Sequence, residues 1–324
     1  MARSVFDAPH FQTEEAAFAY VEAHLWPQGP VCPHCGERTR IGRLAGKTTR
    51  IGLHKCNACK GQFTVRQGSI FESSHLPLHL WLQVIHLMCA SKKGISTRQI
   101  QRMLQCSMKT AWFLTHRIRE AMVSGDIGPF GAGGAVVEAD ETFIGTDPSA
   151  PQRSKHGRHP GMSAKMKVLS LIERDTGRAR SFVLDNYRVE DIQIVLDANL
   201  SRETNLRTDE SSMYTAAGRY YASHEAVNHG RHEYVRKNDV TIHTNTVEGY
   251  FSVFKRGMRG VYQHCSKKHL HRYMAEFDYR YSYRSAVGVE DTQRAQIALT
   301  GFAGKRLTYQ TVGRRTAGDH RIVW

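Results

Sequence analysis

The 324-residue sequence has no long hydrophobic run. A membrane-spanning helix needs roughly 18–20 consecutive apolar residues, whereas the longest candidate, residues 76–90, is interrupted by His79, Gln83 and His86. The first residues, "MARSVFDAPHFQTEEAAFAY", lack the apolar core of a secretory signal peptide. We therefore expect a cytoplasmic protein that has no membrane partner.

Cysteine is also scarce. Seven cysteines in a cytosolic chain argue against a disulfide framework. Three of them, Cys89, Cys106 and Cys265, are isolated and are predicted to be ordinary buried thiols. The remaining four stand in two close pairs, a pattern that requires another explanation.

Acidic residues are outnumbered. The chain has 30 aspartates and glutamates and 45 lysines and arginines, so the net charge is +15 and the isoelectric point about 9.6. Such a charge favours polyanionic partners, nucleic acid first among them, although membrane surfaces and ribosomal RNA would satisfy the charge alone. The length admits two domains with small appendages.

The paired cysteines have the spacing of a metal site. Two C-x-x-C pairs are separated by 20 residues, and their members are Cys32, Cys35, Cys56 and Cys59. Four thiolates at this spacing predict one closed, tetrahedral, structural zinc site. We place it in a small β zinc ribbon over residues 31–70, after an N-terminal helical segment, residues 1–30. A redox dithiol pair and an iron–sulfur site are the alternatives.

Residues beside the cysteines refine this prediction. Gly36 and Gly61 follow the two pairs and suit the tight turns that aim both sulfurs of a pair at one metal. His34 and His54 lie close by in the sequence, but four sulfurs already complete a tetrahedral shell. We expect both histidines to stay outside it.

The segment of residues 76–123 reads as helices. Ser96 or Thr97 can cap a short helix, and Ser107 can cap a longer basic one after a tight turn. This pattern is typical of a helix-turn-helix DNA-binding domain, with a plain helical hairpin as the alternative. The second helix is predicted to bury Ala111, Leu114 and Ile118, and to expose Lys109, Thr110, Arg117 and Arg119.

A Gly-rich linker, residues 124–134, precedes a different pattern. Residues 135–144 read as a strand containing Asp140, and two further strands are joined by a turn at residues 175–177. A helix over "RVEDIQIVLDANL", a short strand ending at Asp209 and a helix from His243 follow. This order predicts a ribonuclease-H-like core with a mixed sheet over residues 135–285. The remaining residues, 286–324, form a tail of unclear role.

The helix that begins near His243 has two distinct faces. At about 100° per residue, an apolar stripe is formed by Val247, Tyr250, Phe251, Phe254 and Met258. A carboxylate, an amide and an amine lie beside that stripe, where a buried side meets the surface; they belong to Glu248, Asn245 and Lys255.

The acids at these positions suit divalent metal. Two magnesium ions about 3.5–4 Å apart can activate a nucleophile and stabilise the leaving oxygen of a phosphodiester, and magnesium prefers oxygen ligands. Asp140 lies in an apolar strand, where a carboxylate is costly unless it is paired or binds metal. Glu138 and Glu141 should point to the opposite face of that strand, so we expect neither to bind metal, and Glu210 is excluded similarly.

Several stretches together carry a family resemblance. They include "CPHCG", "CNACKGQF", "KTAWFLTHRIREAM", "VEADETFIG", "TDESSMY" and "HTNTVEGYFSVFKRGMRGVY", in order from about residue 15 to 285. The chain resembles bacterial insertion-sequence transposases of the DDE superfamily. More narrowly, it resembles the zinc-ribbon-bearing, ISXO-like group called IS-fifteen-ninety-five.

The resemblance implies a catalytic triad that holds two Mg²⁺ ions, with Mn²⁺ as a substitute. Asp140 is the first ligand, Asp209 the second and Glu248 the favoured third. Asn245 shares a helix face with Glu248 and is the alternative; otherwise it orients a water or touches DNA. Lys255 would contact a phosphate near the cleavage point.

The implied function is that of a DNA transposase. It would bind terminal inverted repeats, hydrolyse phosphodiester bonds at the element ends and join the 3′-hydroxyl to target DNA by transesterification. Its partners would be double-stranded DNA and a second copy of itself, at least a dimer on DNA, in the bacterial nucleoid. Predicted DNA contacts are Lys109, Thr110, Arg117, Arg119, Lys255, Arg256, Arg259, Lys267 and Lys268.

Two rival functions remain. A catalytically silent transposase relative could act as a sequence-specific DNA-binding protein. His269, His271 and Tyr273 also fit a nickase that forms a covalent tyrosyl–DNA bond. That chemistry needs the histidines on a strand, and the segment reads as a helix. A basic Pro/Gly-rich insert, residues 146–165, is expected to be a loop that orders on DNA or stays disordered.

Overall fold

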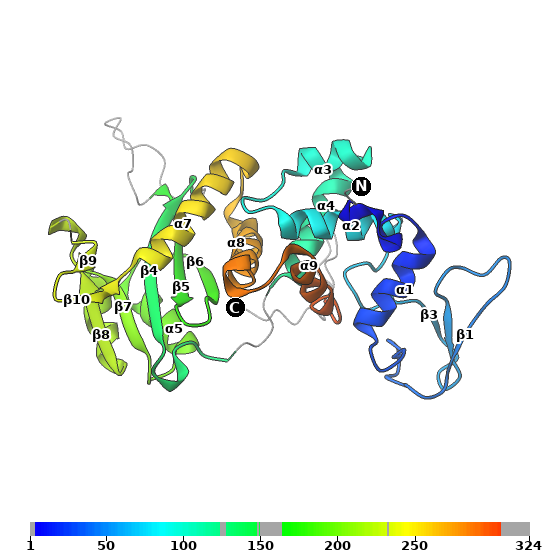
Figure 1. Cartoon of the computed structure of the whole chain (residues 1–324), viewed down its shortest axis with the longest axis horizontal. Helices are drawn as coiled ribbons and strands as arrows, with labels where there is room; N and C mark the ends of the chain where they lie inside the picture. Colours follow the sequence, from blue (N-terminus) through cyan, green and yellow to red (C-terminus); the bar gives the residue numbers. More distant parts are fainter. Residues whose placement is uncertain (1–3, 124–127, 148, 150–163, 232, 306–324) are drawn as a thin grey trace.

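The computed structural model describes residues 4–123, 128–147, 149, 164–231 and 233–305. Figure 1 shows a sheet-based core at one end, a helical region in the middle and a small ribbon at the other end. Residues 124–127 of the predicted linker, most of the predicted insert and the end of the predicted tail lie outside the described residues. Within those ranges, no helix combines the length and the apolar character that crossing a membrane requires.

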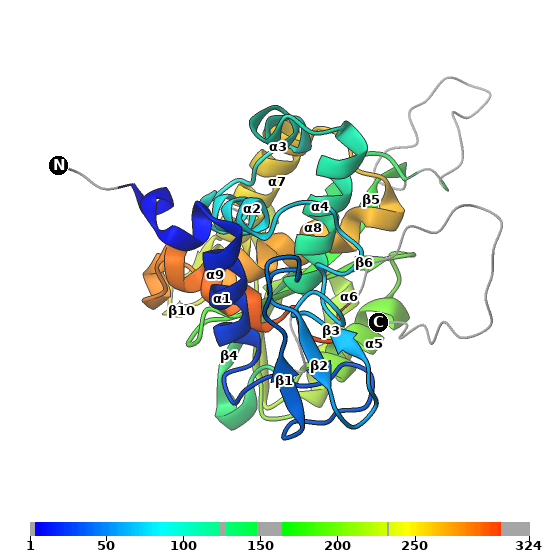
Figure 2. The ribbon, with the colours of Figure 1, turned by 90° about the vertical axis from the view of Figure 1, so that its right-hand side faces the viewer.

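The ribbon is a small antiparallel sheet that follows helix α1, Glu14–Leu25. Its strands lie in the order β1-β2-β3 and face the viewer in Figure 2; their bounds are Ile41–Arg43, His54–Cys56 and Gln62–Phe63. The apolar cluster at the centre of this unit has few buried members, namely Cys32, Cys56 and Phe63. So small a core gives the ribbon little stability of its own, and a bound metal would supply the rest.

The middle region contains the predicted helix–turn–helix segment. Its helices are α2, Leu78–Ala90, α3, Thr97–Leu104, and α4, Met108–Ala121. Ser96 caps α3 by accepting a hydrogen bond from the backbone N–H of Gln99, and Ser107 caps α4 in the same way. The caps at Ser96 and Ser107 therefore match the sequence-based prediction.

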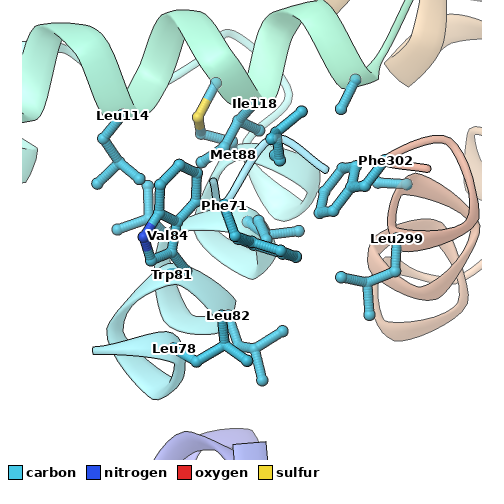
Figure 3. Packing of buried hydrophobic residues seen from close by; sticks show 14 of the residues in the cluster. Phe71, Leu78, Trp81, Leu82, Val84, Met88, Leu114, Ile118, Leu299 and Phe302 are labelled. Carbon is cyan, nitrogen blue, oxygen red and sulfur yellow. The ribbon is translucent and has the colours of Figure 1, made fainter. Parts of the chain in front are cut away.

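One apolar core holds this region together. Figure 3 shows Phe71 and Trp81 packed under Leu114 and Ile118 of α4. A helix from the predicted tail, α9, Asp291–Thr300, lies against α2 and adds Leu299 to the same core, and Phe302 follows it. Part of the segment with no predicted role thus closes the helical core.

Two DNA-contact predictions on α4 are wrong about exposure: Arg117 and Arg119 are buried. Arg117 donates hydrogen bonds to the backbone carbonyls of Ile70 and Glu72, at 2.9 and 2.7 Å. Arg119 is 0% exposed and pairs with Glu276 of α8, Lys267–Ser282, at 2.7 Å. Because α4 is covered on more than one side, little of its C-terminal half faces solvent.

The core is built on a five-stranded mixed sheet. The strands lie in the order β6-β5-β4-β7-β8, and their bounds in chain order are β4 Val136–Ile144, β5 Met166–Glu173, β6 Ala179–Leu184, β7 Asn205–Asp209 and β8 Ser223–Val227. β4 pairs antiparallel with β5, and β5 with β6, whereas β4, β7 and β8 run parallel. The first four of these strands were predicted; β8 was not.

Helices cover both faces of this sheet. α7, Asn245–Gly257, and α8 pack on one face, and the predicted apolar stripe of α7 is buried there. α5, Val189–Asn199, and α6, Ser212–Ala217, pack on the other. A hairpin of β9, Val235–Arg236, and β10, Asp239–His243, leads into α7, and a π-helical turn, Met258–Tyr262, follows it. The hairpin, α6 and the π-helical turn were not predicted.

Candidate metal-binding active site

Asp140 and Asp209 stand next to each other in the sheet. In the parallel pairing of β4 with β7, Glu138 lies opposite Arg207, so the two aspartates follow at the same level two residues later. Their carboxylate oxygens lie within 4.8 Å of each other. β7 ends at Asp209, so the second aspartate is the last residue of its strand.

Glu141 belongs to the same group. Carboxylate oxygens of Asp140, Glu141 and Asp209 all lie within 4.8 Å of one another. Strand alternation does start the Glu141 side chain on the α6 face. However, β7 stops at this level, and a glutamate is long enough to reach around its end to the aspartates. Alternation therefore gives the starting face of Glu141 but not its distance from the aspartates, and the expectation that it does not bind metal stays a prediction.

Crowding changes the acidity of this group. Burial, followed by the negative charges of Asp209 and Glu248, raises the pKa of Asp140 to about 7, against hydrogen bonding from Glu141 N–H and the charge of Lys255. Burial and then the Asp140 charge raise the pKa of Glu141 to about 8. Carboxylates that repel one another in a partly buried place are the setting that a divalent cation relieves.

Glu248 lies on α7, across from the aspartates. Its Oε1 is 3.2 Å from Nε2 of His229 and accepts a hydrogen bond from Thr244 Oγ1 at 3.1 Å, while its side chain is 40% exposed. It stands outside the 4.8 Å group, although its charge contributes to the raised pKa of Asp140. Asn245 is exposed at the start of α7, and the Lys255 ammonium lies 5.8 Å from the Phe251 ring centroid.

Glu138 fastens the aspartate-bearing strand to α7. One oxygen accepts a hydrogen bond from the Val247 N–H at 2.9 Å, and the other pairs with Arg174 Nε at 2.5 Å. Arg174 also donates to the carbonyls of Thr241 and His243, each at 2.6 Å. Sequence reasoning kept Glu138 away from metal but missed this anchoring role, since alternation indicates a face and not a partner.

The four ribbon cysteines converge. Their sulfurs lie within 4.8 Å of one another, and the Cys32–Cys59 and Cys35–Cys56 sulfur pairs are each 3.7 Å apart. A tetrahedron with zinc–sulfur bonds of about 2.3 Å has edges of about 3.8 Å, so the spacing fits zinc. Gly36 takes a positive φ of 74° at the first turn, but Lys60 (φ 65°), not Gly61, takes it at the second.

The two histidines beside the cysteine pairs were expected to stay outside the zinc shell. His34 and His54 stand outside the sulfur group. His54 Nδ1 lies 3.0 Å from the Gly52 carbonyl oxygen instead.

The predicted DNA-contact residues fall into different settings. Exposed positions include Lys109, Thr110, Arg256, Arg259 and Lys268. Lys267 is partly buried, because its ammonium pairs with Asp147 at 3.0 Å and Asp185 at 3.2 Å. His269, His271 and Tyr273 lie within helix α8, so they do not form the strand-borne nickase pattern.

Comparisons with known proteins agree with this geometry. Residues 132–282 match the family model of the ISXO2-like transposase domain, and residues 12–62 match that of the transposase zinc-ribbon domain. The chain is also 25% identical over 283 residues to an uncharacterized protein in transposable element ISH50 of Halobacterium salinarum, covering 83% of this chain and 91% of that protein. The two domains follow each other here as ribbon and sheet-based core, and the chain belongs to the family of insertion-sequence transposases that carry them.

Proposed function

We propose that this chain is a DDE-type DNA transposase that cuts the ends of an insertion sequence and joins them to target DNA. The observation that carries the proposal is the Asp140–Asp209 pair, side by side on two adjacent parallel strands, with Glu248 on the helix across from it. This is a place where carboxylates from three separate elements can meet on one ligand.

The strand order supports a ribonuclease-H-like core. Three antiparallel strands are followed, through α5, by two strands parallel to the first, in the order β6-β5-β4-β7-β8. The acids lie on β4, at the end of β7 and on α7. This distribution is the one that the sequence pattern predicted for such a core.

The proposed reaction has two steps. Water attacks the phosphorus at the element end, the P–O3′ bond breaks and a 3′-hydroxyl is freed. That hydroxyl then attacks a target phosphodiester and releases a target 3′-hydroxyl. Magnesium, when bound, would activate the attacking oxygen and neutralise charge on the phosphate.

The side chains of this site have separate roles in the proposal. Asp140 and Asp209 would hold metal, and Glu248 would complete the site after leaving His229. Glu248 is favoured over Asn245 because a carboxylate is the better magnesium ligand. Lys255, two helical turns further along α7, would contact a phosphate.

The helical region supplies the proposed DNA-reading surface. If α3 and α4 act as a helix-turn-helix, the start of α4 enters the major groove, where Lys109 and Thr110 are exposed. Arg256, Arg259 and Lys268 would contact the DNA backbone. Lys267 would join them only by exchanging Asp185 for phosphate. Pairing two element ends would require at least a dimer on DNA.

The proposal is tested with labelled DNA that carries the element's own ends, in magnesium. Asp140→Asn, Asp209→Asn and Glu248→Gln should abolish cleavage and strand transfer while DNA binding persists. The exposed neighbour Glu210→Gln is the matched control and should keep activity. Activity that survives in Asp140→Asn, or a covalent protein–DNA adduct, would refute the two-metal reaction. Loss in Asn245→Ala with an active Glu248→Gln would move the third ligand to Asn245.

A further inference from the structure

We propose that Glu141 is a third carboxylate ligand beside Asp140 and Asp209, so that one divalent cation is held from two adjacent strands while Glu248 serves the second cation. This inference rests on the proposed function and assigns a ligand that the resemblance did not imply.

The first support is reach. Oxygens of all three side chains lie within 4.8 Å of one another. Two oxygens bound to one magnesium at 2.0–2.1 Å are about 3 Å apart when adjacent and about 4 Å apart when opposite. Small side-chain rotations therefore suffice to bring the three carboxylates onto one ion.

The second support is an unmet hydrogen-bonding need. In the part of the chain that the structure describes, Glu141 Oε1 and the hydroxyl of Tyr214 are buried without a hydrogen bond of ordinary geometry, although these two side chains interact with each other; the Tyr214 side chain is 0% exposed. Buried polar groups are normally satisfied, and a charged one without partners is costly.

Several other buried carboxylates of this protein have ionic or hydrogen-bonding partners, although one oxygen of Glu22, like one of Glu141, has no hydrogen bond. Glu138 is bound by Arg174 and the Val247 N–H, and Glu276 by Arg119 and Arg280. Glu173 accepts hydrogen bonds from Gly131 N–H and Arg178. The burial of these three acids is accounted for by their ion pairs and hydrogen bonds. Glu141 has no ion pair with a basic side chain in the described residues, and its carboxylate lies beside those of two aspartates, so a bound cation would supply the missing positive charge.

The third support is charge balance. Asp140, Asp209 and Glu248 carry three negative charges, which leaves two divalent cations with one positive charge in excess. Glu141 raises the number of carboxylates to four, so that two divalent cations are neutralised. Lys255 then remains free to meet the charge of a phosphate.

Mn²⁺ binding to the full-length, zinc-loaded protein tests the inference without DNA or turnover. Free Mn²⁺ is followed by electron paramagnetic resonance for wild type, Glu141→Gln, Asp140→Asn, Glu248→Gln and the control Glu210→Gln. We expect Glu141→Gln to weaken the tighter Mn²⁺ site tenfold or more, as Asp140→Asn does. Glu248→Gln should keep that site and lose the weaker one, and Glu210→Gln should match wild type.

The outcomes separate this inference from the proposed function. Wild-type Mn²⁺ affinity in Glu141→Gln, with affinity lost in Asp140→Asn, overturns the inference alone. Unchanged affinity in Asp140→Asn refutes the metal site itself. If Glu141→Gln does not fold, Glu141→Asp keeps the charge on a shorter arm. Its Mn²⁺ affinity should then fall several-fold, and a wild-type value overturns the inference.

Discussion

Glu138 of β4 accepts a hydrogen bond from the backbone N–H of Val247, 2.9 Å away in the first turn of α7. Glu138 is two residues from Asp140, and Val247 is next to Glu248, so this single contact ties together the two elements of the site. A carboxylate at the start of a helix is also favoured by the helix dipole. Glu138 thus helps to position Glu248 relative to Asp140.

Glu138→Ala should destabilise the protein strongly. The change leaves Arg174, whose side chain is only 16% exposed, without its carboxylate partner, and breaking a buried pair costs about 3–5 kcal/mol. Urea unfolding measures the free energy, with Glu210→Gln as the exposed control. An unfolding free energy equal to that of wild type would show that the anchor is dispensable.

Lys109→Ala should weaken DNA binding, whereas Arg119→Ala should destabilise the fold. Lys109 is exposed, so its loss should weaken DNA binding and reduce the salt-dependence slope by about one, without changing stability. Arg119 and Glu276 are both 0% exposed, so removing the arginine leaves the buried carboxylate with Arg280 as its remaining basic partner and opens a cavity, which should together cost about 3–5 kcal/mol.

Fluorescence anisotropy at several salt concentrations and thermal melting separate these effects. Arg202→Ala changes an exposed arginine on the α5 side and serves as the control. Destabilisation by Lys109→Ala, or none by Arg119→Ala, would contradict the placement of these side chains.

Cys56→Ser should release one zinc ion per chain. The ribbon has a very small apolar core, so it should become sensitive to protease between residues 31 and 62 while the rest of the chain stays resistant. Zinc content and limited proteolysis measure both effects. Cys106→Ser changes a thiol outside the sulfur group and should keep its zinc. Full zinc content in Cys56→Ser would rule out the four-sulfur site.

Metal affinity should rise with pH. Asp140 and Glu141, with pKa values raised to about 7 and about 8, hold protons that a cation must displace. Without metal, these groups bind more protons in the folded state than in the unfolded state. Their contribution to stability is therefore fully present below about pH 4 and is lost as the pH rises through about 7 to 8.

The measurements are Mn²⁺ affinity and melting temperature from about pH 5.5 to about pH 8.5. Asp140→Asn removes one of the titrating groups. Its metal-free melting temperature should fall less steeply than that of wild type over this range. Equal slopes for the two proteins would show that Asp140 does not titrate there.

Periodicity predicted the elements better than it predicted the partners. The buried stripe of α7 and the caps at Ser96 and Ser107 depend on local spacing, and all were found as predicted. Arg119 lies outside the apolar stripe of α4, yet it is buried because α8 arrives from 150 residues away in the chain to pair with it. A helical wheel contains no information on such a contact between two helices that are distant in the sequence.

Alternation also gives no distances. It directed Glu141 to the α6 face, yet a carboxylate oxygen of Glu141 lies within 4.8 Å of those of Asp140 and Asp209, and whether it binds metal stays a prediction. Strand β8, "SHEAV", is short and mostly polar, so its sequence gives no clear period-two signal. It becomes recognisable as a strand only through its parallel pairing with β7.

The composition of the helical core also determines when this region can fold during synthesis. Phe11 and Phe302 belong to one apolar cluster, although almost the whole chain separates them. During synthesis, the apolar surface of α2 must wait until α9 has left the ribosome, and contacts of such long range slow folding. We infer that an incomplete product, released before α9, would carry an unfinished helical region. The chain would then complete its helical region only after α9 has left the ribosome.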